Sequence, residues 1–190
     1  MNPRARGGLS GFGAALALAL APGEARAVEN EHHLALGTGL SILQVDRKST
    51  HSMGPGVSLQ YAYQVTDAFC FMGEFASSVV AKDEAGGPDV PHTRPTGVDS
   101  LGIGPGYVLD ITQKWFVYGG GLLSGWALTG GTLDKPVYAF GGQLAVGVDY
   151  MLTPHFALGF AFRQQVLLTR MDTYPTYYSG FFRAAIVWGR

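Results

Sequence analysis

The sequence predicts an all-β fold, specifically an eight-stranded antiparallel up-and-down transmembrane β-barrel. Three observations indicate it: apolar and small or polar residues alternate in eight segments, the connections alternate between short and long, and the chain is poor in charge. Of the 190 residues, 14% are charged, against roughly 25% in an average soluble protein. The 28 glycines also fit a soluble glycine-rich β-protein, so the prediction depends on the alternation and not on composition.

The clearest alternation runs from Val137 to Arg163. Every second residue from Tyr138 to Tyr150 is large and apolar except Gly142, and the residues between them are small or polar. A turn at 152–155 follows, after which the period of two resumes. Because a period of two sends alternate side chains to opposite faces of a strand, this stretch predicts a hairpin with one apolar face and one small, polar face.

Six other segments repeat this pattern, and each has about the 9–11 residues of a tilted transmembrane strand. The predicted strands cover residues 33–43, 55–65, 69–81, 98–109, 115–128, 137–151, 156–163 and 177–188. In every strand we expect the large apolar row to face outward. For the fifth strand, this places outward Phe116, Tyr118, Leu122, Trp126 and Leu128. Its inward row is then Gly119, Gly121, Gly125 and Ala127.

The connections between strands differ in length in a regular way. Those at 66–68, 110–114 and 152–155 are short, and those at 46–54, 82–97, 129–136 and 169–176 are longer and polar. Bacterial outer-membrane barrels have short periplasmic turns and long external loops. Near the periplasmic ends we expect an aromatic girdle of Tyr63, Phe69, Tyr107, Phe116, Tyr150, Phe156 and Trp188.

Residues 1–27 have the pattern of a cleaved secretory signal peptide. Arg4 and Arg6 give a positive start, residues 13–21 an apolar core, and Ala25–Ala27 a small-x-small cleavage site. The apolar run is shorter than the roughly 20 residues of a spanning helix. We therefore expect export through the inner membrane and a mature barrel of residues 28–190 in the cell outer membrane.

A soluble lipocalin-like barrel or sandwich is the alternative fold. Such proteins bury their large apolar residues, whereas here the opposite face holds glycine and alanine mixed with Glu, Gln and Arg, which would make a poor soluble core. The net charge of −1 provides no field for nucleic acid, so no nucleic-acid partner is expected. Cys70 is the single cysteine, which excludes an intramolecular disulfide.

The sequence segments Gly147–Thr153 and Phe156–Arg163 resemble the strand-turn-strand motif of small outer-membrane β-barrels. This superfamily includes the membrane domain of outer membrane protein A and the outer membrane protein X and W groups, and the pattern resembles it from Val28 to Arg190. The resemblance implies insertion by the barrel assembly machinery, which reads a terminal aromatic residue. Here Trp188 is followed by two further residues. We expect a monomer in contact with outer-membrane lipid.

Seven polar residues fall on the predicted inward face. Eight strands leave an interior that side chains can fill, and buried charges there must be paired and hydrogen-bonded. We expect a polar network that fills the lumen, and a small or gated channel is the alternative. The network residues are Gln60, Gln64, Glu74, Gln143, Arg163, Gln165 and Arg183.

The predicted external loops each contain basic residues. They serve either solubility or pairing with lipopolysaccharide phosphates, which Arg and Lys bind well, and both hypotheses stay open. The residues are Arg47, Lys48, Lys82, Arg94, Lys135 and Arg170.

No catalytic, cofactor-binding or metal site is predicted. The five histidines lack metal-ligand spacing. Ser49, His51 and Ser52 lie together in the predicted first loop but have no evident acid partner. Because Ser and His occur together in this loop, a lipid A-modifying enzyme is kept as the second alternative. The expected function is non-enzymatic, in envelope integrity or in surface interaction through the external loops.

Overall fold

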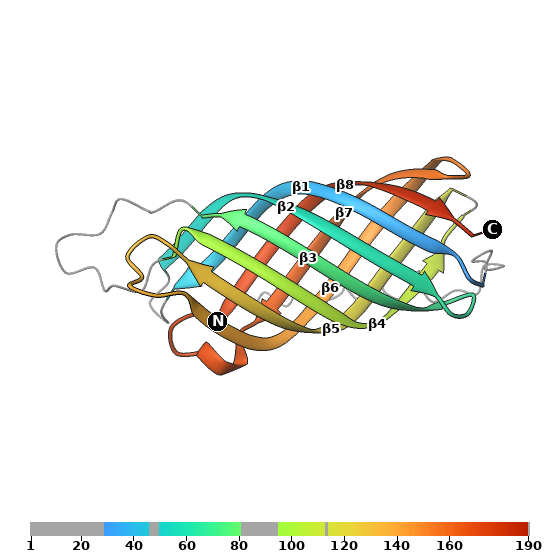
Figure 1. The fold of residues 1–190 in the computed structure, drawn as a ribbon. Coiled ribbons are helices and arrows are strands. Elements are labelled where there is room, and N and C mark those ends of the chain that lie inside the picture. The colour runs from blue at the N-terminus through green and yellow to red at the C-terminus, as the bar shows by residue number, and fades with distance from the viewer. Residues whose placement is uncertain (1–28, 46–49, 81–94, 113, 190) are drawn as a thin grey trace, which may run out of the picture.

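The computed structural model describes residues 29–45, 50–80, 95–112 and 114–189. The predicted signal peptide lies outside the described residues. The described chain forms eight strands and one short 3₁₀ helix (Figure 1). They are β1 (His32–Val45), β2 (Thr50–Gln64), β3 (Phe69–Val79), β4 (Gly97–Asp110), β5 (Trp115–Thr129), β6 (Val137–Thr153), β7 (Phe156–Val166), η1 (Leu168–Arg170) and β8 (Thr176–Trp188).

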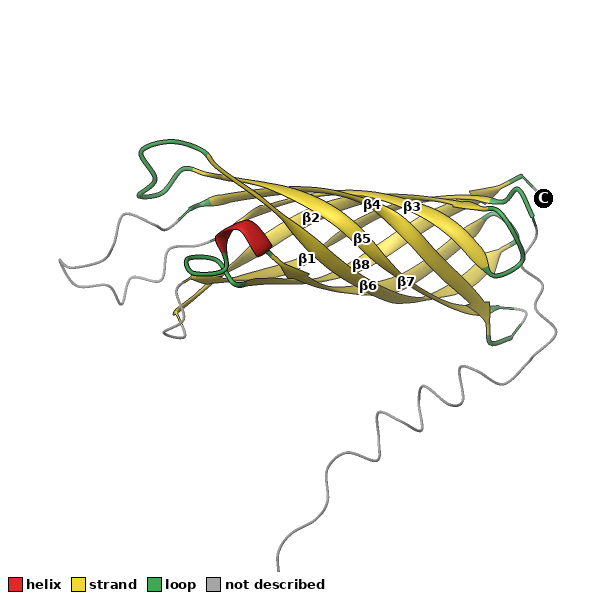
Figure 2. Cartoon of the chain, turned by 90° about the horizontal axis from the view of Figure 1, so that it is seen from below, coloured by secondary structure: helices red, strands yellow, loops and turns green. Residues whose placement is uncertain are grey.

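Each strand pairs antiparallel with the next, and β1 pairs with β8 to close the barrel. The closing seam runs from His32 opposite Trp188 to Leu43 opposite Tyr177. Closure removes the free sheet edges, whose unpaired N–H and C=O groups a membrane interior could not satisfy. The tilted strands and the closed wall are seen in Figure 2. The predicted fold class is thus confirmed.

The end of β2, the end of β4, the end of β6 and the end of β8 lie at one end of the barrel, which we call the turn end (Figure 1). Residues 65–68 and 154–155 form tight turns there. The β5–β6 connection and the β7–β8 connection with η1 lie at the opposite end, which we call the loop end. Strands extend further toward the loop end than expected, because β2 begins at Thr50 and β7 continues to Val166. The predicted first loop is therefore partly strand.

On seven of the strands, the exposed and buried rows are those expected from the sequence. On β6, for example, Phe140 is exposed and Ala139 is buried. The outer wall presents large apolar side chains over its whole circumference, as a lipid-facing wall requires. The small and polar rows face the lumen.

On β5 the predicted facing is wrong. Phe116, Tyr118, Leu122, Trp126 and Leu128 are all buried inside, while the Gly and Ala row faces outward and Leu123 is 77% exposed. The sequence predicts the alternation on this strand correctly but assigns the two rows to the wrong faces. A shift of one residue exchanges the two faces of a strand.

Neighbouring glycines explain the inverted phase. Tyr118 lies opposite Gly147 of β6, and its ring occupies the space where a side chain at that position would begin. Leu122 similarly lies 3.4 Å from a Cβ built on Gly102 of β4. Large β5 side chains therefore fill space that glycines on both adjacent strands leave open.

The predicted girdle is corrected at the same strand. Phe116 faces the lumen, and Trp115 takes its place on the outer wall, where its ring centroid lies 4.9 Å from that of Tyr150. Phe69 and Tyr107 form a similar contact at 5.8 Å.

In the part of the chain that the structure describes, there is no helix of the length and apolarity that crossing a membrane requires.

The inverted facing of β5 can be tested with tryptophan fluorescence, since the chain has three tryptophans. A variant with Trp115→Phe and Trp188→Phe keeps only Trp126. In vesicles of lipids with brominated acyl chains, we expect little quenching, because this indole lies in the lumen. The matched variant that keeps only Trp115 should be strongly quenched. Equal quenching of the two variants would show that the side chain of Trp126 faces lipid.

Candidate functional site in the barrel lumen

The structure places all seven predicted network residues inside the barrel, each no more than 7% exposed. They come from five strands, because each strand contributes its inward row. Gln60 and Gln64 lie on β2, Glu74 on β3, Gln143 on β6, Arg163 and Gln165 on β7, and Arg183 on β8.

One ion pair crosses the lumen. Arg163 Nε on β7 lies 2.7 Å from Glu74 Oε2 on β3, and both side chains are about 1% exposed. These strands are not neighbours in the barrel, so the pair joins separate parts of the wall. The Arg163 guanidinium also lies 4.7 Å from the ring centroid of Phe181, a cation–π contact that desolvation strengthens.

Arg183 on β8 forms a second buried pair. Its Nη2 donates to Asp149 Oδ2 on β6 at 2.5 Å, and its Nη1 donates to Gln60 Oε1 on β2 at 2.5 Å. The guanidinium lies 4.2 Å from the ring centroid of Tyr118 on β5. One planar side chain with five fixed donors therefore contacts three other strands, and its charge is balanced by Asp149.

Sequence reasoning left Asp149 out of the network. It placed this residue on the inward face of its strand but did not pair it with an arginine. The signal was present, because an acidic residue in the inward row of an eight-stranded barrel needs a cationic or hydrogen-bonding partner. The two carboxylates and two guanidiniums give this layer of the lumen balanced charge.

Two of the four lumen glutamines accept hydrogen bonds from β5. Ser124 Oγ donates to Gln143 Oε1 at 3.2 Å, and Trp126 Nε1 donates to Gln165 Oε1. The sequence prediction had Trp126 facing lipid and assigned no face to Ser124, which lies in the same row. The inverted facing of β5 thus supplies hydrogen bonds as well as bulk to the lumen.

Apolar side chains fill the lumen at the loop end. We call this group the loop-end apolar cluster, and Leu43, Leu128 and Leu167 within it are 0% exposed. Beneath it, the hydroxyls of Ser78 and Tyr177 are 2.6 Å apart. The cluster consists of Leu43, Val45, Val80, Val98, Trp126, Leu128, Ala139, Leu167, Tyr174 and Tyr177.

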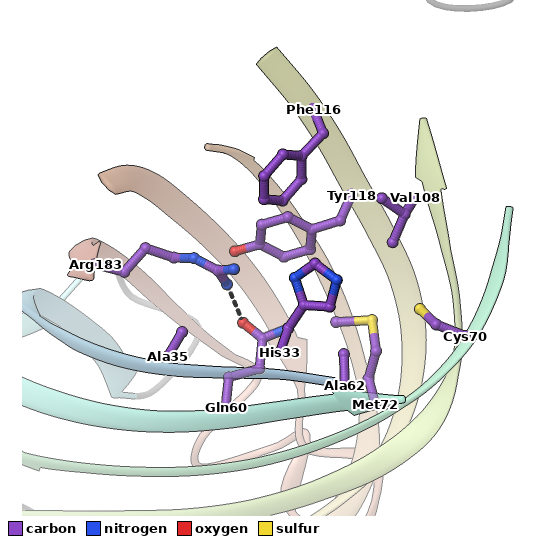
Figure 3. Close-up of a pocket in the computed structure, with 10 residues that line it drawn as sticks. All are labelled: His33, Ala35, Gln60, Ala62, Cys70, Met72, Val108, Phe116, Tyr118 and Arg183. Carbon is purple, nitrogen blue, oxygen red and sulfur yellow. Dashed lines mark hydrogen bonds between the residues drawn. The ribbon is translucent and has the colours of Figure 1, made fainter. Parts of the chain in front are cut away.

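A cavity lies on the turn-end side of Arg183 (Figure 3). His33, Met72 and Tyr118 are among the side chains that line it, with the buried thiol of Cys70. Its volume is about 20 Å³, which is room for roughly one water molecule. The cavity is therefore large enough for a water molecule but too small for a larger solute. The side chain of His33 is buried in the wall of this cavity.

The predicted external basic residues are only partly described. Lys135, in the β5–β6 connection, and Arg170, in η1, are exposed at the loop end. Arg47, Lys48, Lys82 and Arg94 lie outside the described residues.

The structure does not assemble the suggested serine–histidine pair. His51 and Ser52 lie on β2 and not in a loop, and they occupy opposite faces, with His51 exposed and Ser52 buried. Ser49 lies outside the described residues. Among the described residues, no three His, Cys, Asp or Glu side chains are grouped so that they could hold a metal ion.

A closed sheet with an apolar outer wall and a polar, filled interior defines a transmembrane β-barrel protein. Comparison of the sequence with protein families gives the same class: residues 13–184 match the outer membrane protein beta-barrel domain. The chain belongs to this family, whose members reside in the outer membrane. Among curated protein sequences, none matches the chain.

Solved structures with the same fold include three outer-membrane proteins. Neisserial surface protein A is 19% identical, with a TM-score of 0.60 over 84% of this chain and 98% of that one. Ail, the attachment invasion locus protein of Yersinia pestis, is 14% identical, with a TM-score of 0.56 over 85% and 100%. OprG from Pseudomonas aeruginosa is 12% identical, with a TM-score of 0.57 over 85% and 98%. These identities show a shared fold alone.

The ion pair across the lumen gives a stability prediction. Glu74→Ala leaves the Arg163 guanidinium buried without its counter-ion, and we expect the free energy of unfolding to fall by about 3–5 kcal/mol. Urea unfolding of the folded barrel, followed by tryptophan fluorescence, measures this loss. The double variant Glu74→Leu/Arg163→Met should recover most of it, because apolar residues of similar volume remove both buried charges.

The matched control is Asp134→Ala, which removes an exposed carboxylate from the β5–β6 connection. We expect a change within about 0.5 kcal/mol. If Glu74→Ala were as mild as this control, the cross-lumen pair would not contribute to stability.

Proposed function

We propose that this protein is a non-enzymatic outer-membrane barrel with a side-chain-filled lumen, and that it acts in envelope integrity or in surface interaction through its external loops. The observation that supports the proposal is the filling of the lumen. The loop-end apolar cluster occupies one part, and the buried Glu74–Arg163 and Arg183–Asp149 pairs occupy the next. A barrel filled in this way offers its loops and outer wall, and not its interior, to other molecules.

The channel alternative has less support. A path for a hydrophilic solute needs continuous polar volume, whereas the loop end of the lumen is lined by apolar side chains such as Leu43 and Leu128, both 0% exposed. Conduction would require this cluster to separate and the two ion pairs below it to break. The enzyme alternative has less support from the described residues, because His51 and Ser52 face opposite sides of the wall and do not meet.

Surface interaction is supported by the exposed basic residues of the loop end and by one structural neighbour. Ail has been crystallised with the heparin analogue sucrose octasulfate, which is a polyanion. We propose that Lys135 and Arg170 pair with the phosphates of lipopolysaccharide through charge-assisted hydrogen bonds. We also propose a monomer inserted by the barrel assembly machinery, with the exposed Trp188 near the end of β8 as the aromatic signal.

Charge reversal tests the lipopolysaccharide contact. Lys135→Glu/Arg170→Glu should reduce the lipopolysaccharide that co-purifies with the barrel by about tenfold, because one charge-assisted contact contributes about that factor. The control is Lys114→Glu, since Lys114 is exposed at the turn end, on the opposite side of the membrane. An unchanged amount of lipopolysaccharide in the double variant would contradict the proposal.

Single-channel recording in a planar bilayer tests the filled lumen. We expect the purified barrel to give no discrete conductance steps, because no continuous polar path leads through the loop-end apolar cluster. Folding of the same sample is checked by its heat-dependent shift on electrophoresis, and a large-pore porin in the same bilayer checks detection. Reproducible openings from the folded protein would contradict the proposal and favour the channel alternative.

A further inference from the structure

A groove of about 370 Å³ lies in the outer wall where β2, β1, β8 and β7 run side by side. Gly180 on β8 forms part of its floor, because it has no side chain and lies between Leu40 of β1 and Phe162 of β7 in the register. The side chains that line the groove are Leu40, Ile42, Met53, Phe160, Phe162, Tyr178 and Phe182.

The aromatic walls of this groove are paired across β7 and β8. The rings of Phe160 and Phe182 meet edge to face with centroids 5.5 Å apart, and those of Phe162 and Tyr178 are stacked at 6.3 Å. Leu40 and Phe182 are 57% and 72% exposed. The groove is therefore an open, apolar hollow between two rows of side chains on the face that contacts lipid.

Toward the loop end the groove stops at a polar rim. On each of its four strands, the next outward residue is polar, in contrast to the apolar residue within the groove. The rim residues are Gln44, His51, Gln164 and Thr176. Thr176 Oγ1 donates to Gln44 Oε1 at 2.7 Å, so the rim is also linked across the β1–β8 seam.

A basic residue lies in the connection that joins the loop ends of β7 and β8, and the helix of that connection packs against β6. The connection between β7 and β8 contains η1, and Arg170 within it is exposed. The polar rim marks the place where the apolar band of the barrel meets the membrane interface. A molecule that fits this arrangement is apolar along its length and polar or anionic at its loop-end terminus.

We propose that this groove is a binding site for one acyl chain of a phosphorylated lipid of the outer leaflet. The chain lies over Gly180 between the aromatic walls and Leu40, where it contacts more surface than on a flat wall. The headgroup lies at the polar rim, toward the β7–β8 connection that contains Arg170. This site lies on the outer wall and not in the lumen. Its headgroup part rests on the lipopolysaccharide contact proposed above, because both use Arg170, whereas its acyl-chain part depends on the groove alone and is tested by the groove variants.

Filling the groove tests this site. Gly180→Leu places a side chain on the groove floor, and Gly142→Leu is the matched control, because Gly142 faces lipid on β6 with nothing within 4 Å of an added Cβ. The probe is dipalmitoylphosphatidylglycerol, titrated onto the purified barrel in detergent and counted by native mass spectrometry. We expect wild type and Gly142→Leu to retain one lipid.

Gly180→Leu should bind the probe about tenfold more weakly, since excluding two methylene groups from an apolar site corresponds to roughly that factor. Equal retention by Gly180→Leu and the control would overturn the proposal. A wild-type dimer that is lost in Gly180→Leu would also overturn it, because a second copy would then be the occupant.

A second pair of variants keeps the test valid if Gly180→Leu does not fold. Leu40→Trp fills the groove from β1, and Leu123→Trp adds the same ring to an exposed position on β5. Loss of the bound lipid in Leu40→Trp alone supports the site. Retention in both variants overturns it.

Discussion

Pairing of backbone N–H and C=O groups within the wall is the constraint on which the rest of this structure depends. A membrane interior offers no water to unpaired groups, so a sheet can cross it only when the first and last strands pair. Here the β1–β8 seam makes that closure along a continuous register from His32 to Leu43. Closure at eight strands then fixes a narrow interior, and the filling of that interior follows from its width.

The lumen is filled by complementary contributions from neighbouring strands. Glycines on β4 and β6 leave space, and Tyr118 and Leu122 of β5 occupy it. The aromatic rings and glutamines then surround two guanidiniums, each with its own carboxylate. Because a buried charge without a partner is costly, the four charged residues function as a set, and the balance between them restrains the wall on opposite sides of the barrel.

Because the interior is filled, the surfaces that remain accessible to other molecules include the loop end and the outer wall. The loop end presents the exposed basic residues Lys135 and Arg170, and outer-membrane barrels place their long loops at the cell exterior. The wall presents the groove over Gly180 to lipid. Both surfaces face the same leaflet, so the loops and the wall together offer a headgroup and its acyl chain adjacent contacts.

The sequence by itself determined the strand number, the turn and loop ends and the membrane-facing wall of seven strands, because alternation and loop length are local properties. It also placed Glu74, Arg163 and Arg183 on inward rows. Only the tertiary structure decided which charges meet, since the Glu74–Arg163 pair joins strands that are not neighbours. The tertiary structure also decided which face of β5 points into the lumen. Alternation of large residues and glycines has the same period whichever of the two rows faces lipid. The choice depends on the space left by glycines on adjacent strands, which no single segment encodes.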